Sequence, residues 1–283
     1  MMTVNNEKCI GCGMCVKDCF PKDIEMVEDK AQINNVTCFK CGHCIAVCPT
    51  NAISMDEYDM KEVIDYDKQK FQIDPDNLLN FIKFRRTIRQ FKDCEVEEEK
   101  ISKIIEAGRF TETGGNMQDV SYTVLRKNLE ELRELTLKSL KNMGEYLLNN
   151  LTPETMRYKR YAKMWINMYR EYNENPQSED RLFFNAPVII VVTANSQVNG
   201  ALASSNMELM TNALGLGTVF SGFLTKAANE TKEIRDFIQV KEGKEVVTCM
   251  IVGYPNVKYR RTVPRKVADI CCKCQSRIDP CGS

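Results

Sequence analysis

The sequence has little of what marks several common classes of protein. It contains one histidine and one tryptophan in 283 residues, and 39 Lys and Arg residues balance 39 Asp and Glu residues. Such a balance creates no overall field that would draw the protein to nucleic acid or to a lipid surface. We therefore expect neither as a partner.

Long hydrophobic runs are also missing. The longest, APVIIVVTA at 186–194, is about half the length that a membrane span requires. The amino-terminal residues do not form a charged and then apolar signal. We expect a soluble, cytoplasmic protein, in which the 14 cysteines would be metal ligands or free thiols, because disulfides are rare in that compartment.

Eight of these cysteines form an internal repeat. KCIGCGMCVKDCFP at 8–21 and TCFKCGHCIAVCPT at 37–50 have the same C-x-x-C-x-x-C-x-x-x-C spacing. In this iron–sulfur run three cysteines ligate one cluster and the fourth crosses to the other. Gly11, Gly13 and Gly42 lie between the cysteines, where glycine lets the backbone curl around a metal.

Structural zinc and disulfides are the alternative interpretations. Zinc sites usually use two separated C-x-x-C pairs, and disulfides need a secretory context. Both fit a doubled four-cysteine run less well than clusters do. The single histidine, His43, lies inside the second run, and we expect it beside the metal or in solvent and not as a ligand.

Residues 1–60 resemble bacterial two-cluster ferredoxins. The resemblance implies two 4Fe–4S clusters with crossed ligation: Cys9, Cys12, Cys15 and Cys48 for one, and Cys38, Cys41, Cys44 and Cys19 for the other. The proline that follows the fourth cysteine is present as Pro49 but is displaced to Pro21 by Phe20 in the first run. This change alters the cover of one cluster without removing a ligand.

A connector at 61–77 leads to a larger second domain at 78–268. Asp74 and Pro75 predict a helix start, and Ile101, Ile104 and Ile105 give a second helix from about Glu97 an apolar face. Further helices are predicted at 129–148, 154–172, 201–214 and 230–238, and strands at 121–125, 186–194, 218–220 and 245–254. The irregular alternation favours a layered mixed sheet over a barrel.

Two stretches of the second domain carry candidate chemistry. RRTIRQF at 85–91 places three arginines beside a hydroxyl, and guanidinium groups suit a phosphate monoester. A basic helix end is also common as a complement to the helix dipole. TETGGNMQD at 111–119 contains an adjacent glycine pair, which would let a flat ring approach the backbone.

In this order, the two stretches resemble the FMN-dependent nitroreductase family. The likeness continues through NAPVIIVV at 185–192, NMELMTNALGLGTVFSGF at 206–223, IVGYP at 251–255 and RRTVPRK at 260–266. It implies an α+β homodimer with FMN in the interface.

The resemblance also implies the FMN contacts. Those to the phosphate and ribityl chain would come from Arg85, Arg86, Thr87 and Arg89, with Arg265 closing the phosphate site. Thr113, Gly114 and Asn116 would contact the flavin from the partner subunit, and Ser221 and Gly222 would approach the ring edge. We expect no catalytic side-chain nucleophile, and none is evident in the sequence.

The sequence departs from the family in the glycine-pair stretch. Glu112 replaces the usual Pro, Thr113 replaces Ser, and Asp119 with Val120 replaces Pro and Trp. Thr keeps the hydroxyl, whereas the lost aromatic changes the substrate side of the site. An aromatic and Met stripe on the 154–172 helix is either core or dimer packing, or the wall of a pocket over the cofactor.

The remaining cysteines have no clear motif. Cys271, Cys272, Cys274 and Cys281 lie in a tail at 269–283 whose spacing fits neither a cluster run nor a zinc ribbon. We expect free or redox-active thiols there, with a third metal site as the alternative. Cys94 and Cys249 are predicted to be structural, because an isolated cysteine behaves as a small apolar residue.

Together the two domains predict an oxidoreductase. Clusters move single electrons and a flavin can collect them into pairs, so electrons would pass from the clusters to FMN and on to a nitro-aromatic, quinone or similar acceptor. The donor would be a soluble ferredoxin or NAD(P)H. The alternatives are an electron carrier or docking flavoprotein without small-molecule turnover, and a zinc-stapled structural protein.

Overall fold

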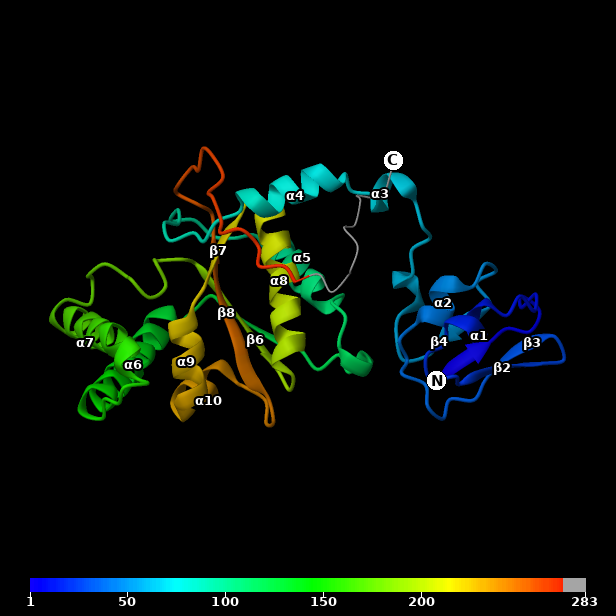
Figure 1. Ribbon diagram of the computed structural model, residues 1–283, viewed down its shortest axis with the longest axis horizontal. Helices are drawn as coiled ribbons and strands as arrows, with labels where there is room; N and C mark the ends of the chain where they lie inside the picture. Colours follow the sequence, from blue (N-terminus) through cyan, green and yellow to red (C-terminus); the bar gives the residue numbers. More distant parts are fainter. Residues whose placement is uncertain (272–283) are drawn as a thin grey trace. The chain divides into compact units, whose positions relative to one another are not determined.

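The computed structural model describes residues 1–271. The chain divides into two units: residues 1–72 with 86–257, and residues 73–85 with the segment from 258 onward. Figure 1 shows the order of the elements along the chain.

The cysteine-rich residues form two similar halves, as the repeat predicts. In the order of the chain, the elements are β1 (Met2–Val4), α1 (Met14–Asp18), β2 (Ile24–Val27), β3 (Lys30–Ile33), α2 (His43–Val47) and β4 (Ile53–Met55). β1 pairs with β4 and β2 with β3, both antiparallel. Each five-residue helix follows a glycine with positive φ, Gly13 at 70° and Gly42 at 77°, a backbone conformation that glycine adopts without strain.

Two short helical turns follow, η1 (Met60–Glu62) and α3 (Lys68–Phe71). Helix α4 (Pro75–Phe84) then begins where the sequence predicts: Asp74 Oδ1 accepts a hydrogen bond from the Asn77 amide at 2.8 Å, and Pro75 occupies the first turn. α4 has no buried residue. Leu79 and Phe84 on its apolar side are exposed.

A four-stranded sheet forms the centre of the second domain. Its strands are β5 (Ser121–Leu125), β6 (Val188–Ala194), β7 (Gly217–Phe220) and β8 (Glu245–Gly253), in the spatial order β5-β6-β8-β7. The pairs of strands are antiparallel, and an isolated parallel bridge joins Thr87 to Thr218. The α+β fold class is confirmed.

Helices cover both faces of the sheet. Successive residues of a strand point to opposite faces, so neighbouring residues pack against different helices. Ile190 and Met250 pack against α5 (Glu98–Arg109) and α8 (Gln197–Ala213). On the opposite face, Ile189 and Cys249 pack against four helices, α6 (Leu129–Asn149), α7 (Lys159–Glu174), α9 (Gly222–Glu230) and α10 (Lys232–Ile238). Figure 1 shows α5 and α8 on one side of β6 and β8, and α9 and α10 on the other.

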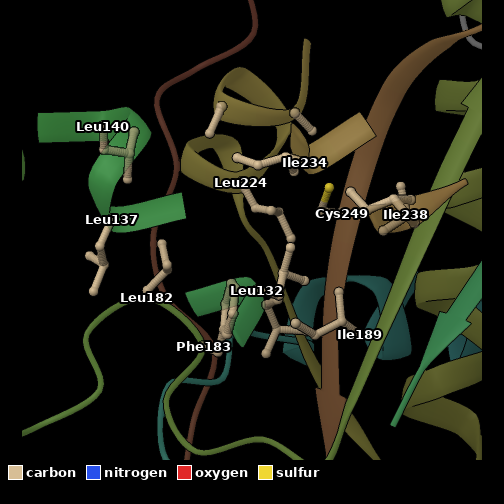
Figure 2. Packing of buried hydrophobic residues seen from close by; sticks show 14 of the residues in the cluster. Leu132, Leu137, Leu140, Leu182, Phe183, Ile189, Leu224, Ile234, Ile238 and Cys249 are labelled. Atoms are coloured by element: carbon tan, nitrogen blue, oxygen red, sulfur yellow. The ribbon is translucent and has the colours of Figure 1, made fainter. Parts of the chain in front are cut away.

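Figure 2 shows part of this second core. Leu132 of α6, Leu224 of α9 and Ile234 of α10 are fully buried there. Every residue of β6 is buried, as expected for a strand covered on both faces. β6 therefore presents no open surface to a ligand.

Most predicted elements are confirmed, with differences at the boundaries. The helix predicted at 154–172 begins later as α7, after a 3₁₀ turn, η3, at Met156–Tyr158. α9 was not predicted. Cys249 is buried in the core as expected, but Cys94 is exposed, so its predicted structural role is wrong.

No helix in the described part of the chain is both long and apolar enough to cross a membrane.

Candidate functional site

Four cysteines line one small cavity in the cysteine-rich domain. They are Cys9, Cys12 and Cys15 of the first run and Cys48 of the second. Cys12 is exposed and Cys15 is buried. The structure thus gathers residues from both runs around a single space.

A second cavity reverses this arrangement. It is lined by Cys38, Cys41 and Cys44 of the second run and by Cys19 of the first. His43 and Pro21 also line it. The displaced proline of the first run therefore still borders this cavity, whereas Phe20 is 83% exposed.

The thiols have the surroundings of cluster ligands. Burial raises the pKa of Cys15, and raises that of Cys44 to about 12. Both thiols would therefore be protonated at neutral pH unless a metal supplied positive charge. Backbone amides donate to the sulfurs of Cys48 from Ala52 at 3.2 Å and of Cys38 from Lys40 at 3.4 Å, the type of contact that tunes iron–sulfur clusters.

Within residues 1–271, no group of three or more His, Cys, Asp or Glu side chains is arranged to hold a single metal ion. The two ligand sets stay predictions.

The arginine stretch is attached to the edge of the sheet. Thr87 forms a parallel bridge with Thr218 of β7, and the Ile88 amide donates to the Thr218 carbonyl at 3.0 Å. Ile88 is buried at this contact. It fits because Gly217 has no side chain: a Cβ there would lie 2.4 Å from Ile88 Cγ1. Arg86 and Thr87 are thereby held beside β7.

Ser221 and Gly222 lie at the other end of the same strand. The Ser221 amide donates to the Cys249 carbonyl at 2.8 Å, and Ser221 Oγ accepts from the Leu224 amide at 3.3 Å. Ser221 therefore caps α9 and is buried, whereas Gly222 is exposed. One short strand thus connects two parts of the predicted flavin site.

The other predicted phosphate ligands are less closely defined. Arg89 is exposed. Arg85 ends α4 and Arg265 lies in the carboxyl-terminal segment, so both belong to the second unit. Their roles stay predictions. Cys271 is exposed, and the predictions for Cys272, Cys274 and Cys281 lie outside the described residues.

The glycine-pair stretch forms a tight loop, residues 113–118. Gly114–Asn116 make a 3₁₀ turn, η2, in which Gly115 has φ 60° and Asn116 φ 55°. Thr113 Oγ1 accepts from the Gln118 amide at 2.9 Å, and the Gly114 amide donates to Asn199 Oδ1 at 3.3 Å. The loop is therefore held both internally and against the start of α8.

Asp119, which replaces the family's proline, supports this loop. Its carboxylate accepts hydrogen bonds from the Asn199 side chain at 2.7 Å and from the amides of Asn195 and Ser196 at 3.0 and 2.9 Å. Although burial opposes ionisation, these hydrogen bonds hold the pKa of Asp119 below its usual value. The departure from the family pattern has a structural role at the start of α8.

The two halves of the predicted flavin site lie at opposite edges of the sheet. Thr218 is on β7, whereas loop 113–118 leads into β5, and β6 and β8 lie between them. Three strand spacings amount to about 14 Å. The register adds a further offset, because Thr218 is level with Val188 of β6 whereas Ser121 is level with Thr193. One chain does not bring the two halves together.

A large cavity adjoins the Ser221 end of β7. Its volume is about 1160 Å³, and it lies among α6, α7 and α9. Tyr161, Trp165 and Phe223 form an aromatic cluster on its wall, with the Trp165 and Phe223 ring centres 5.7 Å apart and nearly perpendicular. Gly222 also lines it.

The aromatic stripe on α7 thus has two roles. Tyr161 and Trp165 line the cavity, whereas Met168 is buried in the core. Sequence reasoning missed Phe223, Tyr146 and Tyr158 as further aromatic wall residues, because they come from other elements and share no spacing with the stripe.

The chain combines a small domain that contains two cysteine cavities with an α+β domain whose edge strand holds an arginine segment. This combination defines a class of two-domain redox protein. Residues 82–254 match the model of the nitroreductase family, and residues 8–52 match that of the 4Fe-4S dicluster domain. The chain belongs to the nitroreductase family, and the predicted fusion of the two domains is confirmed.

Relatives and solved structures resemble the larger domain. An NADPH-dependent oxidoreductase of Staphylococcus haemolyticus is 27% identical over 185 residues, which cover 64% of this chain and 65% of that protein. The chain thus spans about two thirds of that relative's length. The FMN-bound nitroreductase of Bacteroides fragilis has a TM-score of 0.51 at 19% identity, over 69% of this chain and 98% of its own.

A BluB-like flavoprotein of Clostridium difficile has a TM-score of 0.52 at 18% identity, over 69% of this chain and 97% of its own. At these identities the structures support the fold alone.

Proposed function

We propose that this protein is an FMN-dependent oxidoreductase that passes electrons from two 4Fe–4S clusters to FMN and on to a small electrophilic acceptor. The observation that carries the proposal is the pair of cavities, each lined by three cysteines of one run and the fourth of the other. They occur in a chain whose larger domain belongs to the nitroreductase family.

The cysteines would hold the clusters. One set is Cys9, Cys12, Cys15 and Cys48, and the other is Cys38, Cys41, Cys44 and Cys19. The amides that donate to Cys48 and Cys38 would favour the reduced state, since hydrogen bonds to sulfur stabilise added negative charge.

The edge of β7 would hold FMN. Arg86 and Thr87, fixed beside Thr218, would bind the phosphate together with Arg85, Arg89 and Arg265, because guanidinium groups pair with phosphate oxygens. Ser221 and Gly222 would approach the ring edge. Bound FMN supplies a centre that accepts single electrons and delivers pairs.

The complete flavin site would need two copies of the chain. Thr113, Gly114 and Asn116 belong to the edge of the sheet opposite Thr218, and the fully buried strand β6 lies between the two edges. A second copy could bring its own loop 113–118 to the β7 edge. The exposed apolar side of α4 is a further surface that a second copy would cover, so we propose a homodimer.

The acceptor would enter the cavity beside Gly222. Aromatic walls suit flat conjugated molecules, because stacked rings attract one another. Tyr161, Trp165 and Phe223 supply such walls. Nitro-aromatic compounds and quinones are therefore the proposed acceptors. NADPH is one candidate donor, since relatives are named NADPH-dependent oxidoreductases, and a soluble ferredoxin is the other.

Anaerobic purification tests the proposal. Two clusters' worth of iron and sulfide and one FMN per chain are expected, with turnover of nitro-aromatic or quinone acceptors by NADPH or reduced ferredoxin. The Cys12→Ala variant should lose iron and slow flavin reduction. Cys94→Ala is the matched control, because Cys94 is exposed and lines neither of the two cysteine cavities.

Two results would overturn the proposal. A colourless protein without iron and flavin would remove both cofactors and favour a zinc-stapled domain. A flavin that is reduced but is never reoxidised by any small acceptor would favour an electron carrier.

A further inference from the structure

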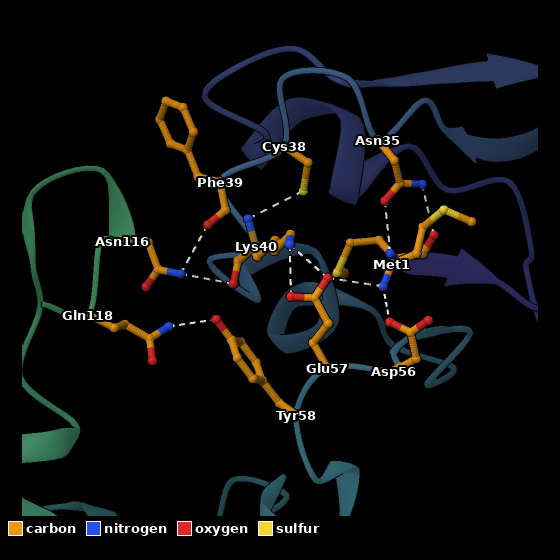
Figure 3. Close-up of polar contacts among 11 residues, drawn as sticks. Met1, Asn35, Cys38, Phe39, Lys40, Asp56, Glu57, Tyr58, Asn116 and Gln118 are labelled. Atoms are coloured by element: carbon orange, nitrogen blue, oxygen red, sulfur yellow. Dashed lines mark hydrogen bonds and ion pairs between the residues drawn. The ribbon is translucent and has the colours of Figure 1, made fainter.

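Loop 113–118 contacts the cysteine-rich domain directly. Asn116 Nδ2 donates to the backbone carbonyls of Phe39 and Lys40, both at 3.0 Å. Gln118 Nε2 donates to Tyr58 Oη at 2.7 Å. Figure 3 shows these contacts between the two segments. The Asn116 side-chain amide thus donates both of its hydrogens, one to each of two successive backbone carbonyls.

The contacted carbonyls belong to the second cysteine cavity. Phe39 and Lys40 lie between Cys38 and Cys41, which line that cavity, and the Lys40 amide donates to Cys38 Sγ. The first cavity is bordered instead by Ile10, Met14 and Met26, three exposed side chains. Asn116 therefore joins its loop to the second cavity.

The backbone of the loop is shaped for this contact. Gly115, Asn116 and Gln118 all have positive φ, a region that asparagine tolerates better than most residues. The Gln118 amide is tied to Thr113 Oγ1. A second anchor is the ion pair of Arg109 at the end of α5 with Glu62, at 2.9 Å. The loop is thus held by contacts within its own chain.

We infer that the second cysteine cavity of one chain supplies electrons to the flavin site of the other chain, at Arg86, Thr87 and Ser221. Asn116 is the residue that positions this cavity beside loop 113–118. The inference rests on the proposed homodimer, in which loop 113–118 completes the flavin site of the partner copy. The same loop contacts the second cysteine cavity of its own chain through Asn116. The shortest connection between cluster and flavin therefore crosses the dimer interface.

The electron count is simple. Each transfer oxidises the cluster in the second cavity by one electron. Two such transfers and one proton from solvent reduce the flavin of the other chain by an electron pair. A one-electron reductant, dithionite in the test, restores the cluster each time.

Hybrid dimers with differently tagged chains test the direction of transfer. A cluster-deficient chain carries Cys41→Ala, and a flavin-deficient chain carries Arg86→Glu. When these two chains pair, the remaining flavin lies on the cluster-deficient chain, beside the loop and intact second cavity of its partner. Rapid flavin reduction by dithionite in a stopped-flow instrument should survive.

The second hybrid pairs a wild-type chain with a chain that carries both substitutions. Here the only flavin lies beside the loop of the chain without an intact second cavity, so the rapid phase should disappear. The opposite pattern, or equal rates in both hybrids, would overturn the inference and leave the proposed function intact. A wild-type protein that is monomeric, or that lacks FMN or iron, would instead refute the proposed function.

Asn116→Ala provides a test without hybrids. Hydrogen exchange at residues 38–41 of the holoprotein should become faster, and flavin reduction by dithionite should slow with saturating FMN present. Cluster absorbance should be unchanged. Asn212→Ala is the matched control, because Asn212 Nδ2 donates to Glu208 O within α8. Unchanged exchange at 38–41 in Asn116→Ala would show that the contact does not form in solution and would overturn the inference.

Discussion

Substitution of Gly217 by alanine tests whether the packing of the arginine segment on β7 determines flavin binding. The new Cβ would lie 2.4 Å from Ile88 Cγ1, 2.9 Å from Ile88 Cβ and 3.1 Å from Pro255 Cγ. Carbon atoms pack best at about 3.5–4.0 Å, so Ile88 must move by about 1 Å. Because Ile88 anchors Arg86 and Thr87 beside Thr218, these residues should move with it.

The expected cost is that of an overpacked core, about 1–3 kcal/mol. The melting temperature should therefore fall by about 2–12 °C for a domain of this size. If about 1.4 kcal/mol of the cost is expressed in the arginine segment, the dissociation constant for FMN rises about tenfold. A fluorescence titration of the apoprotein with FMN measures this constant, and a thermal melt measures stability.

Gly200→Ala is the matched control. Its Cβ would lie 2.6 Å from Val247 Cγ2, a similar clash between α8 and β8 that does not involve the arginine segment. It should lower the melting temperature comparably and leave FMN affinity unchanged. Ile88→Ala combined with Gly217→Ala removes the closest clashing atom and should recover part of the lost stability. If Gly217→Ala binds FMN like wild type while it melts like Gly200→Ala, the position of this segment does not govern binding.

Three further outcomes follow from the described contacts. Asp119→Ala should lower the free energy of unfolding by about 2–3 kcal/mol, because it removes hydrogen bonds to a charged group. Since the pKa of Asp119 is lowered in the folded state, this stabilisation is complete near neutral pH and is lost as pH falls through the folded pKa. The difference in melting temperature from wild type should therefore shrink between pH 7 and pH 3. Trp165→Ala should lower the free energy of unfolding by about 3–5 kcal/mol. Trp165→Phe should be nearly neutral in a thermal melt, because the buried indole nitrogen has no hydrogen-bond acceptor among residues 1–271. Tyr161→Ala should raise KM for a nitro-aromatic acceptor about two- to tenfold through loss of stacking. Tyr66→Ala, in the connector and outside the cavity lining, should leave KM unchanged. Equal KM values in the two variants would show that Tyr161 does not belong to the acceptor site.

The grouping of the cysteines could be predicted because its signal is local. Three cysteines within seven residues must face one another when the backbone curls, and the repeat identifies the partner run. The structure brings each predicted set of four around one cavity. The arginine segment and Ser221 were also recognised from short motifs, and both lie at the ends of one strand.

Other features of the site have no local signal. Phe223 became a wall residue only because α9 packs beside α6 and α7, and α9 itself was not predicted. Asn116 was predicted as a flavin contact, yet its side-chain amide binds two carbonyls 76 and 77 positions earlier in the chain. Asp119, which stands where the family has proline, holds the start of α8 through its hydrogen bond with Asn199.

The amino-acid sequence by itself determined the two-domain organisation, the α+β class and the grouping of the cysteines, because spacing and hydrophobic period act over a few residues. Only the tertiary structure decided that Thr218 and loop 113–118 lie at opposite edges of the sheet, and that this loop binds the second cysteine segment. The order of strands in a sheet depends on which buried faces pack best across the whole chain, and spacing within a short segment contains no information about it.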